Sequence, residues 1–388
     1  MTSKKRMSLL LGASLSGAKD ASPEAQAAWY REMHAKQPVR YQPEHDLWEV
    51  FLYEDVQRVL TESSTFSAEI LVENFPDVGG LNTDPPHHRR YRTLVSKAFT
   101  PRRVAQLTSR IASVVDEILE QGRAQGRIDI VEQLAYPLPV RVIGEMLGVP
   151  TEDQERFRIW SYQLFGFLPN QDNSELMDYF FDQLDQRAKE PQDDLMSALL
   201  AAEMEGEHLT REEVAGMCVG LLAAGNVTTT MLLSVAMRRF IKQPEIFQIL
   251  RNDSSLIPGT IEELLRYEFV GAYNMRVARR DTMIRGNEIK EGQAVMAWLS
   301  AANFDETSFP HAEEFDIRRS PNSHLTFGHG IHYCLGAPLA RLETKVALER
   351  IAAQWSEIRN DPEGSPLYVH PKVDLMLSYP VVFTPANK

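Results

Sequence analysis

The stretch HLTFGHGIHYCLGAPLARLE, residues 324–343, decides the fold of this 388-residue chain. Its cysteine, Cys334, is surrounded by glycines, which are Gly328, Gly330 and Gly336. Glycine lets a backbone turn tightly and approach a flat ligand closely. A helix that begins just after the cysteine places the positive end of its dipole near the sulfur, which favours the thiolate. This setting suits an axial position of a haem iron. The alternative is an inert buried cysteine, which we expect of Cys218.

The spacing F-x-x-G-x-H-x-C-x-G at residues 327–336 resembles the haem-binding signature of the cytochrome P450 family. The resemblance extends over most of the chain, from about residue 29 to residue 383. It implies a mainly α fold with small β-sheets, in which helices form a triangular body around a buried haem. The implied cofactor is haem b, with Cys334 as the ligand of its iron. The loop residues implied to bind the cofactor with Cys334 are Phe327, Gly328, His332 and Gly336.

A long central helix is expected at about 211–242. Thr210-Arg-Glu-Glu213 fits the S/T-x-x-E capping box at its start, and Thr260-Ile-Glu-Glu263 fits the same box at the start of a later helix. No charged residue occurs from 214 to 237, which is long enough to cross a bilayer. Polar residues dilute this stretch and no second one exists, so we expect a core helix and no membrane span.

Within that helix, LLAAGNVTTT at 221–230 contains residues that are poor choices for a helix interior. The segment is similar to the family's oxygen-binding pattern A/G-G-x-D/E-T-T. The similarity implies that Ala224 and Gly225 let the helix pass close to the haem, and that a threonine hydroxyl bonds dioxygen or water. The alternative is packing of small residues against another helix. The residues assigned to catalysis are Thr228, Thr229 and Asn226.

Two positions depart from the family's pattern. Val227 stands where the family usually has an acid that passes protons towards oxygen, and valine cannot relay a proton. The expectation is leaky turnover with more peroxide per product, unless water, a threonine or a substrate hydroxyl substitutes. Phe304 in ANFD replaces the arginine of the common ANRD, and there we expect only a change in packing.

Further motifs imply a structural triad and a propionate site. Glu263-Leu-Leu-Arg266 is similar to the family's ExxR pair, and Arg319 matches the third member of its ion-pair triad. The alternative is that Glu263 only caps its helix and Arg266 is solvated. The residues implied to bind haem propionates are His88, Arg92, Arg276 and His332.

Local patterns place the remaining elements, and they are mainly helical. Helices are expected at about 24–35 and 54–60, a strand over 41–52, a loop over 67–86, and mostly helix over 88–149 and 151–205. Strands return at about 275, where the dipeptides GN and EG indicate hairpin turns. No repeat or linker divides the chain, so we expect a mobile tail at 1–22 and a single haem-binding domain at 23–388.

Composition limits the partners and the cellular compartment that we expect for the protein. The net charge of −13 disfavours nucleic acid as a partner. Two cysteines far apart in sequence fit a reducing compartment, so we expect a cytoplasmic protein. The apolar run after residue 6 is shorter than a secretory signal requires.

Partners follow from charge and from the resemblance. No acidic residue occurs from 87 to 115, whereas seven arginines and lysines do. Family resemblance places this basic face on the cysteine side of the haem, where a ferredoxin or flavodoxin docks; the alternative is a solvated helix face. Apolar residues implied to line the substrate pocket or its entrance are Ile70, Leu71, Val72, Phe75, Val78, Phe165, Phe167, Leu168, Met177, Tyr179, Phe180 and Phe181.

The expected function is a haem-thiolate monooxygenase that hydroxylates or epoxidises a lipophilic substrate, such as a steroid, terpenoid, fatty acid or macrolide. Electrons are expected from a separate ferredoxin or flavodoxin and its reductase. Two alternatives are a peroxide-using haem-thiolate enzyme and a non-catalytic haem-binding sensor or carrier.

Overall fold

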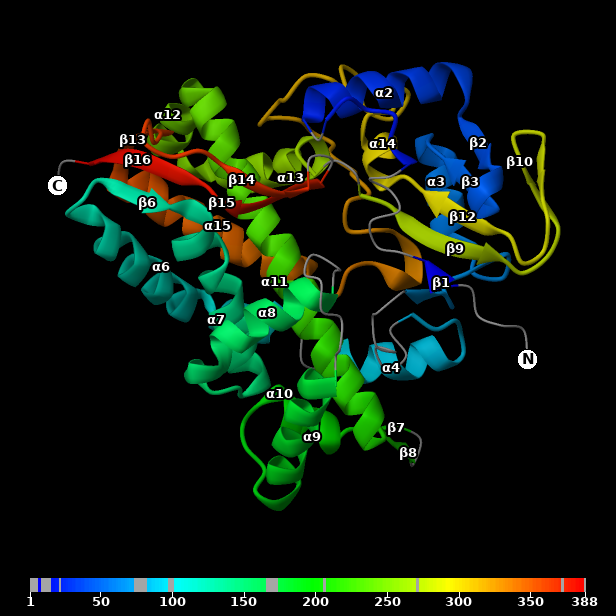
Figure 1. Cartoon of the computed structure of the whole chain (residues 1–388), viewed down its shortest axis with the longest axis horizontal. Helices are drawn as coiled ribbons and strands as arrows, with labels where there is room; N and C mark the ends of the chain where they lie inside the picture. The colour runs from blue at the N-terminus through cyan, green and yellow to red at the C-terminus, as the bar shows by residue number, and fades with distance from the viewer. Residues whose placement is uncertain are drawn as a thin grey trace.

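A single long helix, α11 (Arg211–Lys242), crosses the middle of the protein and organises everything around it (Figure 1). This computed structural model describes residues 6–7, 15–20, 22–72, 82–96, 101–164, 174–204, 207–269, 272–370 and 373–386. At the start of α11 the Thr210 hydroxyl accepts a hydrogen bond from the N–H of Glu213 at 3.2 Å. The Glu213 carboxylate in turn accepts one from the N–H of Thr210 at 2.7 Å. The capping box and the helix bounds expected from sequence are therefore confirmed.

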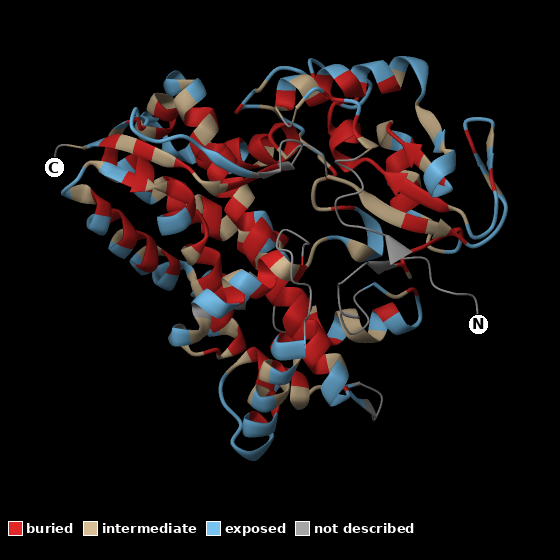
Figure 2. Cartoon of the chain, in the orientation of Figure 1, coloured by how far each residue is buried: buried red, intermediate tan, exposed pale blue. Residues whose placement is uncertain are grey.

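The apolar surface of α11 is enclosed by protein. Among the described residues α11 is the one helix long and apolar enough to cross a membrane, yet 78% of its most apolar window is buried. Figure 2 shows it as a mostly buried rod with helices on either side. Burial all round is what the core helix of a large domain requires.

Helices form most of the body, and several of them pack directly against α11. The longer helices besides α11 are α2 (Pro23–Lys36), α3 (Tyr53–Thr61), α4 (His87–Ser96), α6 (Thr108–Arg123), α7 (Pro137–Leu147), α8 (Gln154–Leu164), α9 (Ser174–Lys189), α12 (Pro244–Asn252), α13 (Ile257–Tyr267) and α15 (Ala337–Gln354). The shorter ones are α5 (Pro101–Gln106), α10 (Leu195–Leu200) and α14 (Leu299–Asn303). The helix-rich body and its triangular outline in Figure 1 agree with the expected fold class.

A five-stranded sheet lies on the other side of α11 from the main group of helices (Figure 1). Its strands, in spatial order, are β2 (Val39–Gln42), β3 (Leu47–Val50), β12 (Ala294–Ala297), β9 (Asn274–Ala278) and β4 (Phe66–Ser67). Within the described strands of this sheet, β3 and β12 pair in parallel and the other neighbours are antiparallel. Every residue of β12 is buried, as a central strand covered on both faces should be.

The remaining sheets are small, as expected. They pair β13 (Trp355–Asn360) with β16 (Pro380–Pro385) and β6 (Arg127–Asp129), β10 (Thr282–Ile284) with β11 (Asn287–Ile289), β14 (Leu367–His370) with β15 (Val373–Ser378), β7 (Glu203–Met204) with β8 (Glu207–His208), and β1 (Arg6–Met7) with β5 (Leu71–Val72). The predicted hairpin turn at GN is confirmed, because Gly286 (φ 80°) joins β10 to the antiparallel β11. The turn at EG, with Gly292 (φ 84°), exists but is not a hairpin, because β12 pairs with β3 and β9 and not with β11.

Three local expectations were wrong. The expected strand over 41–52 is two antiparallel strands, β2 and β3, separated by a short turn. The loop expected at 67–86 contains β5. The second capping box does not form: α13 begins three residues before Thr260, whose hydroxyl donates back to the Leu256 carbonyl at 2.9 Å.

Part of the segment expected as a mobile tail contacts the domain. Ala18 is buried against α2, and Ser16 donates a hydrogen bond to Gln26 at 3.2 Å. Arg40 donates to the Leu15 carbonyl at 3.2 Å. These contacts count against mobility for residues 15–20, and the tail otherwise stays a prediction.

The expected ion-pair triad holds α13 to the segment before the cysteine loop. Arg266 donates to both carboxylate oxygens of Glu263, at 2.7 and 2.8 Å, and neither side chain has any exposed surface. Arg319 approaches the same carboxylate at 3.2 Å. The alternative of a solvated Arg266 is therefore wrong. Phe304 is buried 5.7 Å from the Arg266 guanidinium, which agrees with a change in packing only.

Removal of the Glu263 charge should destabilise the fold. In Glu263→Gln the guanidinium of Arg266 stays buried without a counter-charge, so we expect a loss of about 3–5 kcal/mol in the free energy of unfolding. Urea unfolding measures it, with Glu54→Gln as the control because the Glu54 side chain is 88% exposed. A loss no larger than that of the control would contradict a structural role for the triad.

Candidate functional site

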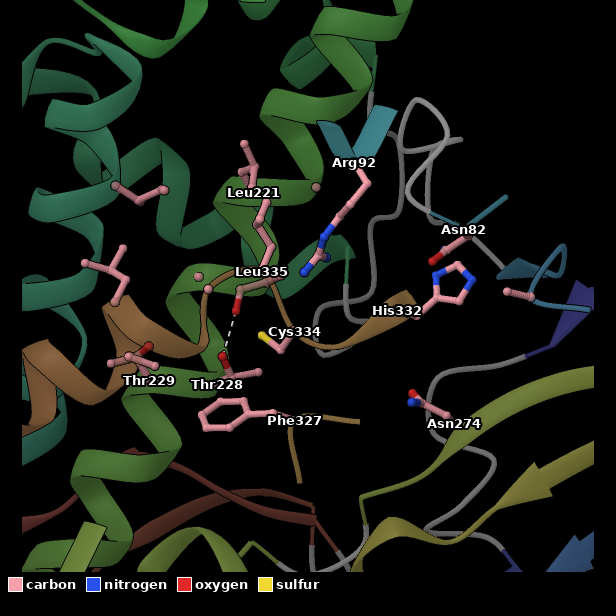
Figure 3. Close-up of a pocket in the computed structure, with 18 of the residues that line it drawn as sticks. Asn82, Arg92, Leu221, Thr228, Thr229, Asn274, Phe327, His332, Cys334 and Leu335 are labelled. Carbon is pink, nitrogen blue, oxygen red and sulfur yellow. Dashed lines mark hydrogen bonds between the residues drawn. The ribbon is translucent and has the colours of Figure 1, made fainter. Parts of the chain in front are cut away.

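A cavity of about 390 Å³ lies between α11 and the loop that carries Cys334 (Figure 3). Its size is within the range of about 300–1,000 Å³ typical of small-molecule sites. One wall is a strip of α11, formed by Gly220, Leu221, Ala224, Gly225, Thr228 and Thr229. The opposite wall is the cysteine loop and the first turns of α15. The cavity therefore brings together the two segments that the sequence singled out separately.

Backbone geometry presents Cys334 to the cavity. Gly328 and Gly330 both have φ of +73°, a left-handed conformation that glycine adopts without strain. A Cβ atom on Gly330 would lie 3.3 Å from the carbonyl oxygen of Leu60. The absence of a side chain at Gly330 therefore also lets the loop lie close to Leu60. The N–H of Cys334 donates to the Phe327 carbonyl at 2.8 Å, which closes the turn.

The Cys334 sulfur lies at the N-terminus of α15, as predicted. Burial nevertheless raises the pKa of the thiol above its ordinary value. The N–H groups of Gly336 and Ala337 and the nearby Arg92 and Arg341 act in the opposite direction without overcoming it. The start of α15 thus favours the thiolate, as expected, but in the protein by itself burial outweighs it. A coordinated cation is what deprotonates such a thiol.

Positive charge is concentrated along one side of the cavity. Arg92, Arg276 and His332 all line it. Arg92 donates to the Tyr333 carbonyl at 2.6 Å, and Arg276 donates to the Met275 carbonyl at 2.7 Å. Neither guanidinium forms an ion pair within the described part of the chain, and burial lowers the pKa of Arg276 to about 10. One buried and one half-buried cation, neither in an ion pair among the described residues, indicate an anionic ligand.

His88, predicted for the same role, lies one layer further out. It is buried but does not line the cavity, and its ring centroid is 4.2 Å from that of His332. Burial and, next, Arg92 lower the pKa of His88, which favours its neutral form.

The cavity face of α11 carries the predicted threonines. The Thr228 hydroxyl donates to the Ala224 carbonyl at 2.7 Å, and Ala224 and Thr228 are exposed where they line the cavity. In Figure 3 the side chain of Thr228 points from α11 towards Cys334. The helix stays α-helical through this segment.

Asn226 and Val227 face away from this cavity. Asn226 has no exposed surface and donates to the hydroxyl of Ser161 on α8 at 3.3 Å. Val227 packs in an apolar cluster with Tyr162 and Leu375. The position of the family's usual acid thus faces a different part of the protein from the Thr228 hydroxyl.

Sequence reading missed three polar residues that line the cavity, which are Asn82, Asn274 and Glu343. Asn274 precedes Arg276 by two, so strand alternation could have placed both on one face. Glu343 follows Leu339 and Ala340 at helical spacing, which could have placed it on the cavity side of α15.

Few of the apolar residues expected at the pocket lie there. Ile70 lines the cavity. Phe75, Val78, Phe165, Phe167 and Leu168 lie outside the described residues. Leu71 and Val72 form β5, whereas Phe180 is fully buried in the main core and Met177, Tyr179 and Phe181 pack against that core.

The cavity fits a haem. A flat apolar group could lie between the Phe327–Leu335 side and the small residues of α11, with its carboxylates at Arg92, Arg276 and His332 and its metal at Cys334. Within the described ranges no group of three or more His, Cys, Asp or Glu side chains could hold a bare metal ion.

Comparison with known proteins agrees with this geometry. Residues 170–356 match the family described as Cytochrome P450. The chain is 40% identical to "Putative cytochrome P450 YjiB" of Bacillus subtilis, over 84% of this chain and 86% of that protein. It is 38% identical to the mycinamicin IV hydroxylase/epoxidase of Micromonospora griseorubida, over 86% and 88% of the two chains.

Solved structures show the same fold. The crystal structure of CYP109E1 from Bacillus megaterium in complex with testosterone superimposes with a TM-score of 0.85 at 35% identity, over 92% of this chain and 97% of that one. A mutant of P450 EryK in complex with erythromycin B gives 0.87 at 33% identity, over 95% and 99%. On these likenesses and on the site described above, the chain belongs to the cytochrome P450 family.

Proposed function

We propose that this protein inserts one oxygen atom from O₂ into a bulky lipophilic substrate, of the steroid or macrolide kind. As a cytochrome P450 it is a haem-dependent monooxygenase, and the similar proteins named above include a macrolide hydroxylase and a testosterone complex. The observation that carries the proposal is the cavity itself, where the Cys334 thiol and the Thr228 hydroxyl line opposite walls.

Each wall of the cavity has a role in this proposal. Bound haem supplies the electron-transfer and oxygen chemistry. Cys334 holds the iron, and Arg92, Arg276 and His332 hold the propionates. Thr228 presents a hydroxyl that can carry a proton at the cavity surface, while Ala224 and Gly225 leave room beside it. Thr229 lies next to it, and Asn226 supports α11 from the other face through Ser161.

The proposed electron donor is a ferredoxin or flavodoxin, in the cytoplasm. Helix α4, the first part of the basic stretch, adjoins the cysteine loop through the hydrogen bond from Arg92 to the Tyr333 carbonyl. Two of the predicted basic residues are engaged elsewhere: Arg90 approaches Glu213 at 3.7 Å, and Arg110 pairs with Glu145. Arg89 and Arg102 are exposed and make no ion pair among the described residues, so they remain available to an acidic partner.

A spectral titration tests the ligation and the substrate class together. We expect the reduced, haem-loaded protein to give the thiolate carbon monoxide spectrum, and Cys334→Ser to lose it. We further expect steroids or macrolides to shift the Soret band towards the high-spin form. An intact thiolate spectrum with no response to either class, or to terpenoids and fatty acids, would favour the sensor or carrier alternative.

Removal of the Thr228 hydroxyl tests whether the protein is an oxygen-using or a peroxide-using enzyme. In Thr228→Val we expect product per reducing equivalent to fall by about tenfold or more, because a positioned proton carrier is lost. Peroxide release should rise, and peroxide-driven turnover should be unchanged. Wild-type protein should itself release some peroxide because of Val227. Unchanged coupling in the variant would favour the peroxide-using enzyme.

Charge reversal tests the docking face. In Arg89→Glu combined with Arg102→Glu we expect reduction by a ferredoxin to slow by about tenfold at low salt and to lose most of its salt dependence. The matched control reverses two other charges, Lys189 on α9 and Arg359 on β13, which are exposed and make no ion pair among the described residues. Equal slowing by the control and the test variants would show that only net charge matters.

A further inference from the structure

The N-terminal strand β1 lies against the backbone of a segment that lines the haem cavity. β1 pairs in parallel with β5, in a register that places Arg6 opposite Leu71. β5 directly follows Ile70, and both Ala68 and Ile70 line the cavity. Figure 1 shows β1 on the side of the molecule that holds the five-stranded sheet. The pairing therefore joins a segment far away in sequence to the wall of the cavity.

This wall segment, residues 66–72, is held differently at its two ends. At its start β4 pairs with β9, and the N–H of Ala68 donates to the buried Asp84 carboxylate at 3.1 Å. At its other end β5 has no strand neighbour except β1 among the described strands. The position of Ile70 therefore depends on fixed contacts before it and on β1 after it.

The chain just before α2 is anchored to the body of the protein. Arg40 donates to the Leu15 carbonyl at 3.2 Å and to the fully buried Glu49 carboxylate at 2.7 Å. Gly17 lies so close to Trp29 that a Cβ atom there would be 2.6 Å from the indole nitrogen. Because a nearby anchor limits the distance that a chain can span, it raises the effective concentration of β1 at β5.

Ile70 connects the anchored chain to the cavity. It belongs to the same hydrophobic cluster as Ala18, Trp29 and Trp298, and only 8% of it is exposed. The same residue lines the haem cavity, so it contacts the core as well as the space for a ligand. A shift of the wall segment would therefore disturb the packing of the cluster and change the shape of the cavity together.

The pairing of β1 with β5 is weak enough to open. It spans two residues on each strand, and an isolated two-stranded sheet is marginally stable in water. Each backbone hydrogen bond adds little net stability, because water competes for the same groups. The pairing thus favours one position of the wall segment without fixing it permanently.

We propose that β1 is a positioning element for ligand binding, which holds the wall segment where Ile70 contacts a bulky ligand in the cavity. The inference rests on the proposed function, because it concerns the same cavity. A small ligand of the iron does not reach the wall, so β1 has no effect on its binding. Loss of the pairing weakens the binding of large ligands and leaves the chemistry at Cys334 and Thr228 unchanged.

The test compares the haem-loaded wild type with two double variants. Arg6→Pro combined with Met7→Pro removes both N–H groups of β1 and so breaks its pairing. The matched control, Arg6→Ala combined with Met7→Ala, changes the same side chains but keeps both N–H groups. A difference between the two variants therefore reports the backbone pairing alone.

Two azoles that bind haem iron through nitrogen serve as probes, bulky clotrimazole and small imidazole. In the proline variant we expect the dissociation constant of clotrimazole, from a Soret titration, to rise about fivefold, as the loss of one or two weak hydrogen bonds allows. The dissociation constant of imidazole should not change. For a steroid or macrolide that is turned over, KM should rise by a similar factor and kcat should stay the same.

Hydrogen exchange provides a readout that does not depend on ligand binding. Amides of the wall segment should exchange about fivefold faster in the proline variant, because their local opening becomes easier. In the alanine variant they should exchange at the wild-type rate. The melting temperature and the carbon monoxide spectrum should be the same in all three proteins.

Each outcome decides the matter. Unchanged exchange of the wall segment in the proline variant would overturn the inference, and so would unchanged clotrimazole affinity. Equal effects on the two azoles, or equal effects of proline and alanine, would overturn it as well. If imidazole gives no Soret shift in the wild type, the proposed function fails instead, since imidazole requires only the haem.

Discussion

The packing of α11 against α15 above the cysteine loop is the constraint on which the rest of the structure depends. Most of α11 and one side of α15 are buried, yet between them the two helices must leave a cavity. Small residues of α11 and the left-handed glycines of the loop provide the space. The ion-pair triad at Glu263 then fixes α13 and the chain that leads into the loop. The residues around the cavity stabilise the fold, and the residues that line the cavity carry the function.

Short sequence motifs predicted the local structure correctly where the residues of the motif also bond to each other in the fold. The Thr210 capping box and the turn at Gly286 involve only a few consecutive residues. The same pattern failed at Thr260, because the Glu263 oxygens bond to Arg266, Arg319 and the chain beyond α14 instead of to a helix start. A capping box reports local preference, and buried long-range partners override it.

The site was predictable to the extent that its residues follow family spacing. Cys334, Thr228, Arg92 and Arg276 meet at one cavity, as their motifs implied. Asn226 does not, because two residues along an α-helix turn the side chain by about 200° away from Thr228. Polar residues without a motif were missed, although helical spacing from Leu339 alone could have flagged Glu343.

The charged groups that line the cavity differ in the partners that the fold leaves them. Cations without carboxylate partners lie on one side, where they favour bound carboxylates. The lone acid lies on α15, away from any arginine that would hold it ionised. An arginine beside Glu343 would lower its pKa and leave it permanently charged. Because none of these cations forms an ion pair with that acid among the described residues, the cations can bind anions while the acid keeps its proton.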